Sequence, residues 1–233
     1  MSTTSTSAPT IVLVHGAWAD GSSWNAVIAR LLSKGLKVVA VQNPLTSLAD
    51  DVAATKRGID FVDGPVVLVG HSWAGFVVTE AGEHPKVKSL VYVSAFSGNV
   101  GQTTGELVGK YPAPPALGGI REDANGFVYL SEQAFVDDVA QDLPSDTARL
   151  LAVTQGPLAK STFGDALTQT AWRTRPSWFI VSASDRAVSP ELQRDAAKLM
   201  GSAVTEVASS HMSPMSHADV VVDAILQAAL VSD

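Results

Sequence analysis

Residues 66–75 read Val-Val-Leu-Val-Gly-His-Ser-Trp-Ala-Gly, and this stretch carries the most specific local pattern in the 233-residue chain. Three valines and a leucine predict a buried strand, and a helical pattern starts directly after it. A serine at such a strand-to-helix turn needs small residues two positions to either side. Gly70 meets this need, Ala74 meets it with one additional methyl group, and Gly75 comes one residue late. The pattern predicts that Ser72 is held above a sheet as a nucleophile; a serine that only caps the helix is the alternative.

Further strand patterns alternate with helical patterns on both sides of this stretch. The strands read as continuous apolar runs, which is typical of strands covered on both faces. We predict an α/β fold with a doubly wound, mainly parallel six-stranded sheet and crossover helices. The predicted strands are Thr10–Val14, Lys37–Val41, Val66–Gly70, Ser89–Ser94, Ser177–Ser182 and Val204–Val207. The predicted helices are Ser22–Ser33, Leu48–Phe61, Trp73–Glu83, Pro190–Met200 and Ser213–Val231.

The regular alternation is lost between residues 97 and 175. This segment begins rich in glycine and proline and continues with helical stretches at 131–142, 145–155 and 160–171. It is far longer than the dozen or so residues that a crossover needs. We therefore predict an inserted, mostly helical cap at 97–175 over a core formed by residues 10–96 and 176–233. Residues 1–9, rich in Ser, Thr and Pro, are expected to form a flexible tail.

Composition narrows the class of protein. Hydrophobic residues make up 46% of the chain and charged residues 17%, which excludes wholesale disorder. The formal charge of −7 without a dense Lys/Arg cluster argues against a nucleic-acid or anionic-membrane partner. The absence of Cys excludes a disulfide framework, a thiolate nucleophile and Cys-bound metal. Apolar runs are too short to cross a bilayer, and the first ten residues lack a signal-peptide pattern, so we expect a cytoplasmic protein.

A serine nucleophile needs a base, and the base needs an acid that orients it. Among five histidines, His211 follows the last strand by a short loop, at the edge of the sheet where the serine turn lies. His217, inside the last helical pattern, is the alternative base. Asp185 directly follows the strand at 177–182 and is placed to orient His211. A turn residue or a salt bridge to Arg186 is its alternative role.

An acyl-transfer site also needs hydrogen-bond donors for an oxyanion. The first strand runs into residues 15–18, His-Gly-Ala-Trp. The backbone N–H of Ala17 and that of Trp73 are the candidate donors. Trp18, Trp73 and Phe96 are the candidate lining of an acyl pocket, with core packing as the alternative for each ring.

The ordered set of motifs resembles the α/β-hydrolase superfamily over nearly the whole chain, from residue 11 to 230. The set comprises His15-Gly16, Gly70-His71-Ser72, Asp185 and His211. Within the superfamily, the chain resembles a bacterial-type esterase of the branch that holds plant methylesterases and hydroxynitrile lyases. The stretches that carry this are residues 13–17 running on to Trp24, 91–96 and 185–191. The resemblance implies a Ser72–His211–Asp185 triad, an oxyanion hole from the Ala17 and Trp73 amides, and a sheet trimmed at its N-terminus.

Two departures refine the expected reaction. Hydroxynitrile lyases place a Lys directly after the catalytic His, and this chain has the uncharged Met212 there, so cyanohydrin cleavage is not expected. Ser72 stands where dehalogenases and epoxide hydrolases have an aspartate.

These departures favour a serine hydrolase that cleaves a carboxylic ester, thioester or lactone, with a small-molecule ester substrate and without a metal or organic cofactor. A non-catalytic small-ligand receptor and a cofactor-free lyase or perhydrolase are the alternatives. The residues are compatible with a monomer or a homodimer.

Overall fold

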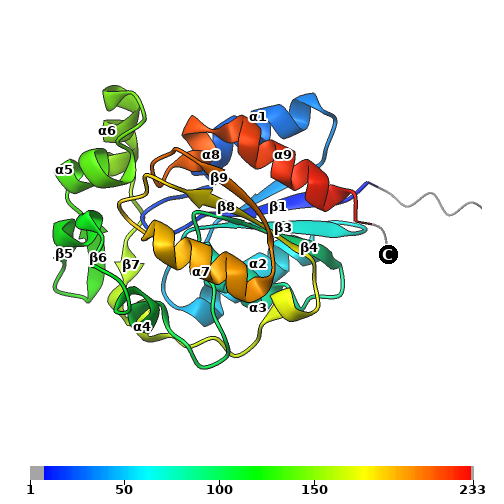
Figure 1. The fold of residues 1–233 in the computed structure, drawn as a ribbon, viewed down its shortest axis with the longest axis horizontal. Coiled ribbons are helices and arrows are strands. Elements are labelled where there is room, and N and C mark those ends of the chain that lie inside the picture. The colour runs from blue at the N-terminus through cyan, green and yellow to red at the C-terminus, as the bar shows by residue number, and fades with distance from the viewer. Residues whose placement is uncertain (1–7, 232–233) are drawn as a thin grey trace, which may run out of the picture.

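A parallel sheet with the strand order β2-β1-β3-β4-β8-β9 forms the centre of the molecule (Figure 1). The structure is a computed structural model that describes residues 8–231. The six strands are β1 (Thr10–Val14), β2 (Val38–Val41), β3 (Val66–His71), β4 (Val87–Val93), β8 (Ser177–Ser182) and β9 (Ala203–Val207). All are paired in parallel, which confirms the predicted fold class. Residues 1–7 of the tail expected at 1–9 lie outside the described residues.

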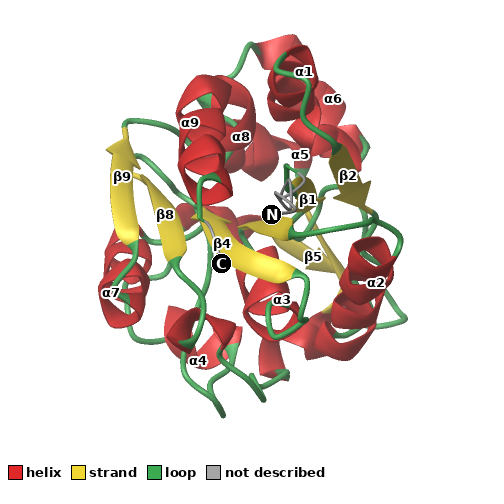
Figure 2. Ribbon diagram, turned by 90° about the vertical axis from the view of Figure 1, so that its right-hand side faces the viewer, coloured by secondary structure: helices red, strands yellow, loops and turns green. Residues whose placement is uncertain are grey.

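Helices cover both faces of the sheet, as Figures 1 and 2 show. On one face lie α1 (Asn25–Ser33), α8 (Ser213–Ser216) and α9 (Ala218–Ala229), and on the other α2 (Leu48–Asp60), α3 (Ala74–Ala81) and α7 (Pro190–Met200). Successive residues of a strand point to opposite faces. Ile11 and Leu13 accordingly belong to the apolar cluster that includes residues of α1 and α9, and Val12 and Val14 belong to the cluster that includes residues of α2, α3 and α7. Both faces of each central strand are therefore buried, which explains the continuous apolar runs.

The ends of the helices follow from local chemistry. Ser47 caps α2 by accepting a hydrogen bond from Asp50 N, and Ser189 caps α7 ahead of Pro190. Gly201 ends α7 in the left-handed conformation (φ +64°). The single helix predicted at 213–231 is wrong in one respect, because a non-helical residue, His217 (φ −129°, ψ 41°), separates α8 from α9. Within residues 8–231, none of the helices combines the length and apolar character needed to cross a bilayer.

The polypeptide between β4 and β8 lies beside the core and carries its own small sheet (Figure 1). Its helices are α4 (Thr104–Val108), α5 (Glu132–Ala134), a π turn at Phe135–Val139 and α6 (Ser145–Val153). Its three antiparallel strands, β5 (Ile120–Glu122), β6 (Phe127–Leu130) and β7 (Leu158–Ala159), are absent from the sequence prediction. We call residues 97–175 the cap, and we propose that it forms a unit separate from the α/β core.

The helix predicted at 160–171 is also wrong. Only a 3₁₀ turn forms, at Lys160–Gly164, and a second one follows at Ala171–Arg173. Between them, Leu167 N donates to Gln102 O (3.0 Å), and Leu167 O accepts from Gly101 N (2.8 Å). These long-range backbone bonds, together with burial of Leu167, hold the chain extended. Tertiary pairing has overridden the local helical pattern here.

Two residues separate β3 from helix α3, which packs closely against the chain that leaves β4. A Cβ atom built on Gly75 would lie 1.9 Å from the carbonyl oxygen of Phe96. A side chain at this position therefore requires the backbone to move.

Substitution of Gly75 by Ala tests this contact. Ala normally stabilises a helix interior relative to Gly. Here we expect Gly75→Ala to lower the free energy of unfolding by about 3 kcal/mol through overpacking, measured by urea denaturation. Gly164→Ala is the matched control, because a Cβ there meets nothing within 4 Å. Equal stability of the two variants would contradict the packing argument.

Candidate active site

The turn that follows β3 holds Ser72 in an unusual backbone conformation. Ser72 has φ +56°, in the left-handed region that costs a non-glycine residue about 1–2 kcal/mol. Three backbone hydrogen bonds fix it: its N–H donates to Val93 O (3.1 Å), and its carbonyl oxygen accepts from Gly75 N (2.9 Å) and Phe96 N (3.1 Å). The serine is therefore locked at the carboxyl end of β3, between β1 and β4.

Two glycines make room for this turn. A Cβ on Gly16 would lie 2.7 Å from Ser72 Cβ, and a Cβ on Gly70 would lie 2.7 Å from Ala74 O. Both approaches are closer than a side chain tolerates, which explains why these positions are glycine. The site is thus built where the chain leaves β1 and β3, the point at which the strand order reverses direction.

A buried histidine–aspartate pair lies next to this turn. His211 Nδ1 is 2.7 Å from Asp185 Oδ2, and both side chains are almost fully buried. The same carboxylate accepts from the side-chain amide of Gln193 (2.8 Å) and from the backbone N–H groups of Ala187 (2.8 Å) and Val188 (2.9 Å). Four donors therefore fix the carboxylate in one orientation, and it in turn orients the imidazole ring.

The contacts of Ala187 N and Val188 N with Asp185 agree with its alternative role as a turn residue, whereas Arg186 and His217 make other contacts. Arg186 pairs with Asp138 (2.6 Å), not with Asp185. His217 bonds Ser216 Oγ (2.9 Å) and is not among the residues that line the cavity described below.

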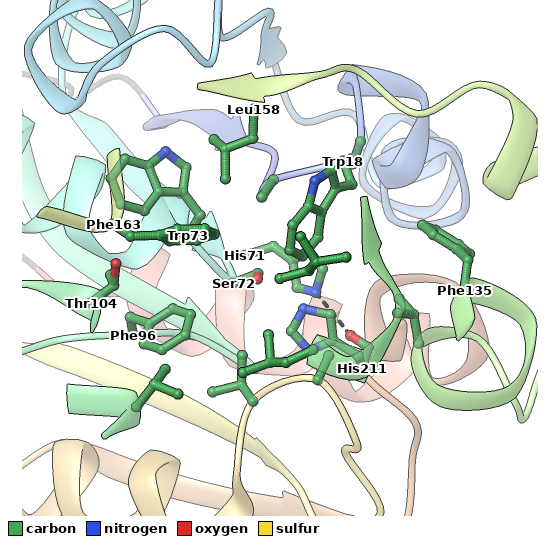
Figure 3. A pocket seen from close by; sticks show the side chains of 18 of the residues that line it. Trp18, His71, Ser72, Trp73, Phe96, Thr104, Phe135, Leu158, Phe163 and His211 are labelled. Atoms are coloured by element: carbon green, nitrogen blue, oxygen red, sulfur yellow. Dashed lines mark hydrogen bonds between the residues drawn. The ribbon is translucent and has the colours of Figure 1, made fainter. Parts of the chain in front are cut away.

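A second histidine, His71, holds the backbone of His211 through a hydrogen bond. His71 Nε2 donates to the carbonyl oxygen of His211 (2.8 Å; dashed line in Figure 3), and the two rings lie 4.7 Å apart. Because a carbonyl only accepts, His71 carries its proton on Nε2. Burial, and secondarily the nearby His211, lower the pKa of His71 well below its ordinary value. His71 is therefore a neutral donor that fixes the backbone of His211.

The loop after β1 is held in a similar way. His15 Nε2 accepts from the backbone N–H of Asn43 (2.9 Å), and His15 Nδ1–H donates to Gly16 O (2.8 Å). The Asn43 side chain donates back to His15 O (3.1 Å). Burial lowers the pKa of His15, which keeps the ring neutral and able to accept.

A cavity of about 280 Å³ opens above Ser72 and His211 (Figure 3). Core and cap both contribute to its walls, and no Asp, Glu, Lys or Arg lines it among the described residues. Its large apolar lining side chains include Trp18, Trp73, Phe96, Phe135, Leu158 and Phe163. Met212 also lines it and is buried. The cap residues Phe135, Leu158 and Phe163 are not among the residues predicted from sequence, since nothing in the sequence indicates which cap side chains face inward.

The proposed oxyanion donors, Ala17 and Trp73, both line the cavity. In the described part of the chain, neither backbone N–H donates to a backbone acceptor. Trp18 has φ +54°, and its indole N–H donates to Val128 O of β6 (2.9 Å). The loop that carries Ala17 is thereby joined to the cap.

The residues proposed from sequence therefore meet at one place. Ser72, His211, Ala17, Trp18, Trp73 and Phe96 line the cavity, and Asp185 lies behind His211. Gln193, which binds Asp185 from helix α7, was missed because no local pattern distinguishes it from an ordinary helix residue.

The buried carboxylate of Asp51 holds the Trp73 side chain through a hydrogen bond. Asp51 Oδ2 accepts from Trp73 Nε1 (2.8 Å), and Asp51 Oδ1 accepts from the backbone N–H of Leu45 (2.8 Å), whose φ is +59°. Asp51 is fully buried, and burial raises its pKa to about 6 against the opposing effect of both hydrogen bonds. Asp51 thus links the turn before α2 to a wall of the cavity.

Comparison with known proteins places this geometry in context. A family model described as "Alpha/beta hydrolase family" matches residues 11–224. "Probable hydrolase R7" of Phoma sp. is 28% identical over 201 residues, which are 79% of this chain and 81% of that protein. A "Carbendazim hydrolyzing esterase" of Nocardioides sp. is 31% identical over 119 residues, 44% of this chain and 48% of that protein.

Solved structures share the fold. The crystal structure of polyneuridine aldehyde esterase matches with a TM-score of 0.80 over 94% of this chain and 98% of that chain, at 20% identity. At this identity the likeness concerns the fold.

The raised pKa of Asp51 predicts how stability depends on pH. An acid whose pKa is higher in the folded state than its ordinary value of about 3.9 stabilises the fold at low pH, and this stabilisation is lost as pH rises through the folded-state value. With a folded-state pKa of about 6, wild type should lose about 1 kcal/mol relative to Asp51→Asn between pH 5 and pH 7.5. Thermal unfolding of both proteins across this range measures it.

Asp50→Asn is the control for that experiment. Asp50 is exposed, and hydrogen bonds from Thr46 and Ser47 lower its pKa. Its substitution should leave the slope between pH 5 and 7.5 unchanged. If the two variants behave alike, Asp51 does not titrate as described.

Proposed function

This chain belongs to the alpha/beta hydrolase family, and on that premise we propose that it is a serine hydrolase, which cleaves a carboxylic ester, thioester or lactone through a covalent acyl-enzyme. The hydrolase class follows from the family and from the relatives described above. The observation that carries the finer proposal is the 2.7 Å hydrogen bond between His211 and Asp185 beside Ser72 on its strained turn.

In the proposed reaction, Ser72 Oγ attacks the acyl carbon while His211 Nε2 takes the hydroxyl proton. Asp185 holds the Nδ1–H tautomer of His211 and stabilises the imidazolium that forms. The electron pair of the carbonyl moves to its oxygen, where the N–H groups of Ala17 and Trp73 stabilise the negative charge.

Collapse of this tetrahedral intermediate expels the alcohol, thiol or lactone oxygen, which receives the proton from His211. Water then attacks the acyl-serine, with His211 again as base, and releases the acid. The proposed steps use side chains and backbone of this chain and require no metal or organic cofactor.

Two features support an ester over the alternatives. The neighbour of His211 is the apolar Met212, which offers no positive charge for a cyanide leaving group. The name of a relative, "Carbendazim hydrolyzing esterase", is in keeping with ester hydrolysis. The absence of charged groups from the cavity wall of the described chain favours a neutral small molecule as substrate.

Replacement of Ser72 tests the proposal. We expect Ser72→Ala to lower the turnover of p-nitrophenyl esters at least 1,000-fold, because the acyl-enzyme no longer forms. A series of acyl chain lengths, assayed between pH 5 and 9 with purified wild type and variant, measures this effect. Ser33→Ala, on the exposed end of α1, should retain wild-type rates.

Labelling with a fluorophosphonate distinguishes the remaining outcomes. Wild type should react at Ser72, and Ser72→Ala should not. A folded wild-type protein that binds esters but neither turns them over nor reacts with the label would refute the hydrolase mechanism and favour a ligand receptor.

A further inference from the structure

The polar groups around the cavity are nearly all used for hydrogen bonds that lead away from it. The Trp18 indole N–H bonds Val128 O, and the Trp73 indole N–H bonds Asp51. His71 bonds the backbone of His211. Apart from the proposed Ser72–His211 machinery, a ligand in the cavity therefore meets mostly apolar surface.

Nδ1 of His71 has no hydrogen-bond partner within the described chain, and Thr104 is the other exception. Its side chain lines the cavity and is 2% exposed, and within the described chain its hydroxyl has no hydrogen-bond partner. Figure 3 shows this hydroxyl beside Phe163 and Phe96, on the side of the cavity away from His211. Buried hydroxyl groups are hydrogen-bonded in most folded proteins, so an orphaned one calls for a partner from outside the chain.

Local structure gives the Thr104 hydroxyl no other use. The neighbouring Thr103 already caps helix α4 in a capping box with Glu106. Thr104 is the first residue of that helix, so no helical carbonyl lies one turn before it to accept its proton. A valine would fill the same volume without burying a polar atom.

The position of Thr104 is also rigid. The capping box fixes the start of α4. A Cβ on the next residue, Gly105, would lie only 3.0 Å from the carbonyl oxygen of Phe163, so the helix packs tightly against the turn at Lys160–Gly164. Because the Thr104 side chain is already ordered, little conformational entropy is lost when a ligand binds. Its hydroxyl can therefore select ligands that carry a polar atom at the matching position.

We propose that Thr104 is a specificity-determining residue whose hydroxyl binds one uncharged oxygen of the substrate, such as a ketone or hydroxyl group, at a distance from the bond that is cleaved. The substrate class is thus a neutral, largely apolar ester with one polar oxygen on its acyl chain. An ionised group is disfavoured because no charged residue of the described chain lines the cavity. The cleavage itself rests on the proposed function, whereas the contact with Thr104 is a matter of binding.

Matched esters test this contact. The probes are p-nitrophenyl hexanoate and its analogues with a ketone at carbon 3, 4 or 5 of the acyl chain. We expect wild type to prefer at least one keto ester, and Thr104→Val to lower kcat/KM for it about ten-fold. The loss should be specific to the keto ester, so that the ratio of its kcat/KM to that of the plain hexanoate falls, and Thr104→Ser should restore this ratio.

Binding measured without turnover separates the two proposals. In the Ser72→Ala background, quenching of Trp18 and Trp73 fluorescence reports the Kd of the same esters. The keto preference and its loss in Ser72→Ala/Thr104→Val should persist there even if the wild type proves not to be an esterase.

Two results would overturn the role of Thr104. One is the absence of a keto preference in wild type at every position. The other is an equal loss for keto and plain esters in Thr104→Val, with thermal unfolding confirming that the variant is folded, since a purely structural residue would affect both alike.

Discussion

The left-handed backbone at Ser72 is the constraint on which the rest of the site depends. Strand β3 turns into helix α3 there, and the strained conformation is held by a hydrogen bond from Ser72 N to Val93 O and by hydrogen bonds from Gly75 N and Phe96 N to Ser72 O. The close approach explains the departure from the strict glycine pattern. The position after Ala74 needs to be glycine, since a Cβ on Gly75 would overlap the Phe96 carbonyl, whereas Ala74 lies buried in the core.

The sequence predicts the core well because its signals are local. Continuous apolar runs place the ends of all six strands within two residues, and the carboxyl ends of parallel strands necessarily share one edge. Ser72, His211 and Asp185 follow three such strands, so chain order alone brings them near one another. The resemblance to the α/β-hydrolase superfamily is confirmed by the family match.

The cap is predicted less well because long-range contacts decide its structure. Residues 160–171 carry a helical pattern, yet backbone pairing with Gly101 and Gln102 keeps Leu167 extended. Gln193 and Thr104 belong to ordinary-looking helices, and only the folded chain reveals that one supports Asp185 and the other faces the cavity. Roles that arise from tertiary contact leave no trace in residue spacing.

The apolar character of the cavity follows from where its polar atoms are directed. Both indole N–H groups in its wall donate outward, one to the cap at Val128 and one to the core at Asp51. Trp18 therefore joins the loop of the proposed oxyanion donor Ala17 to strand β6. In the proposed reaction, the cap that lines the substrate cavity and the loop that stabilises the oxyanion are thus connected by the Trp18 side chain.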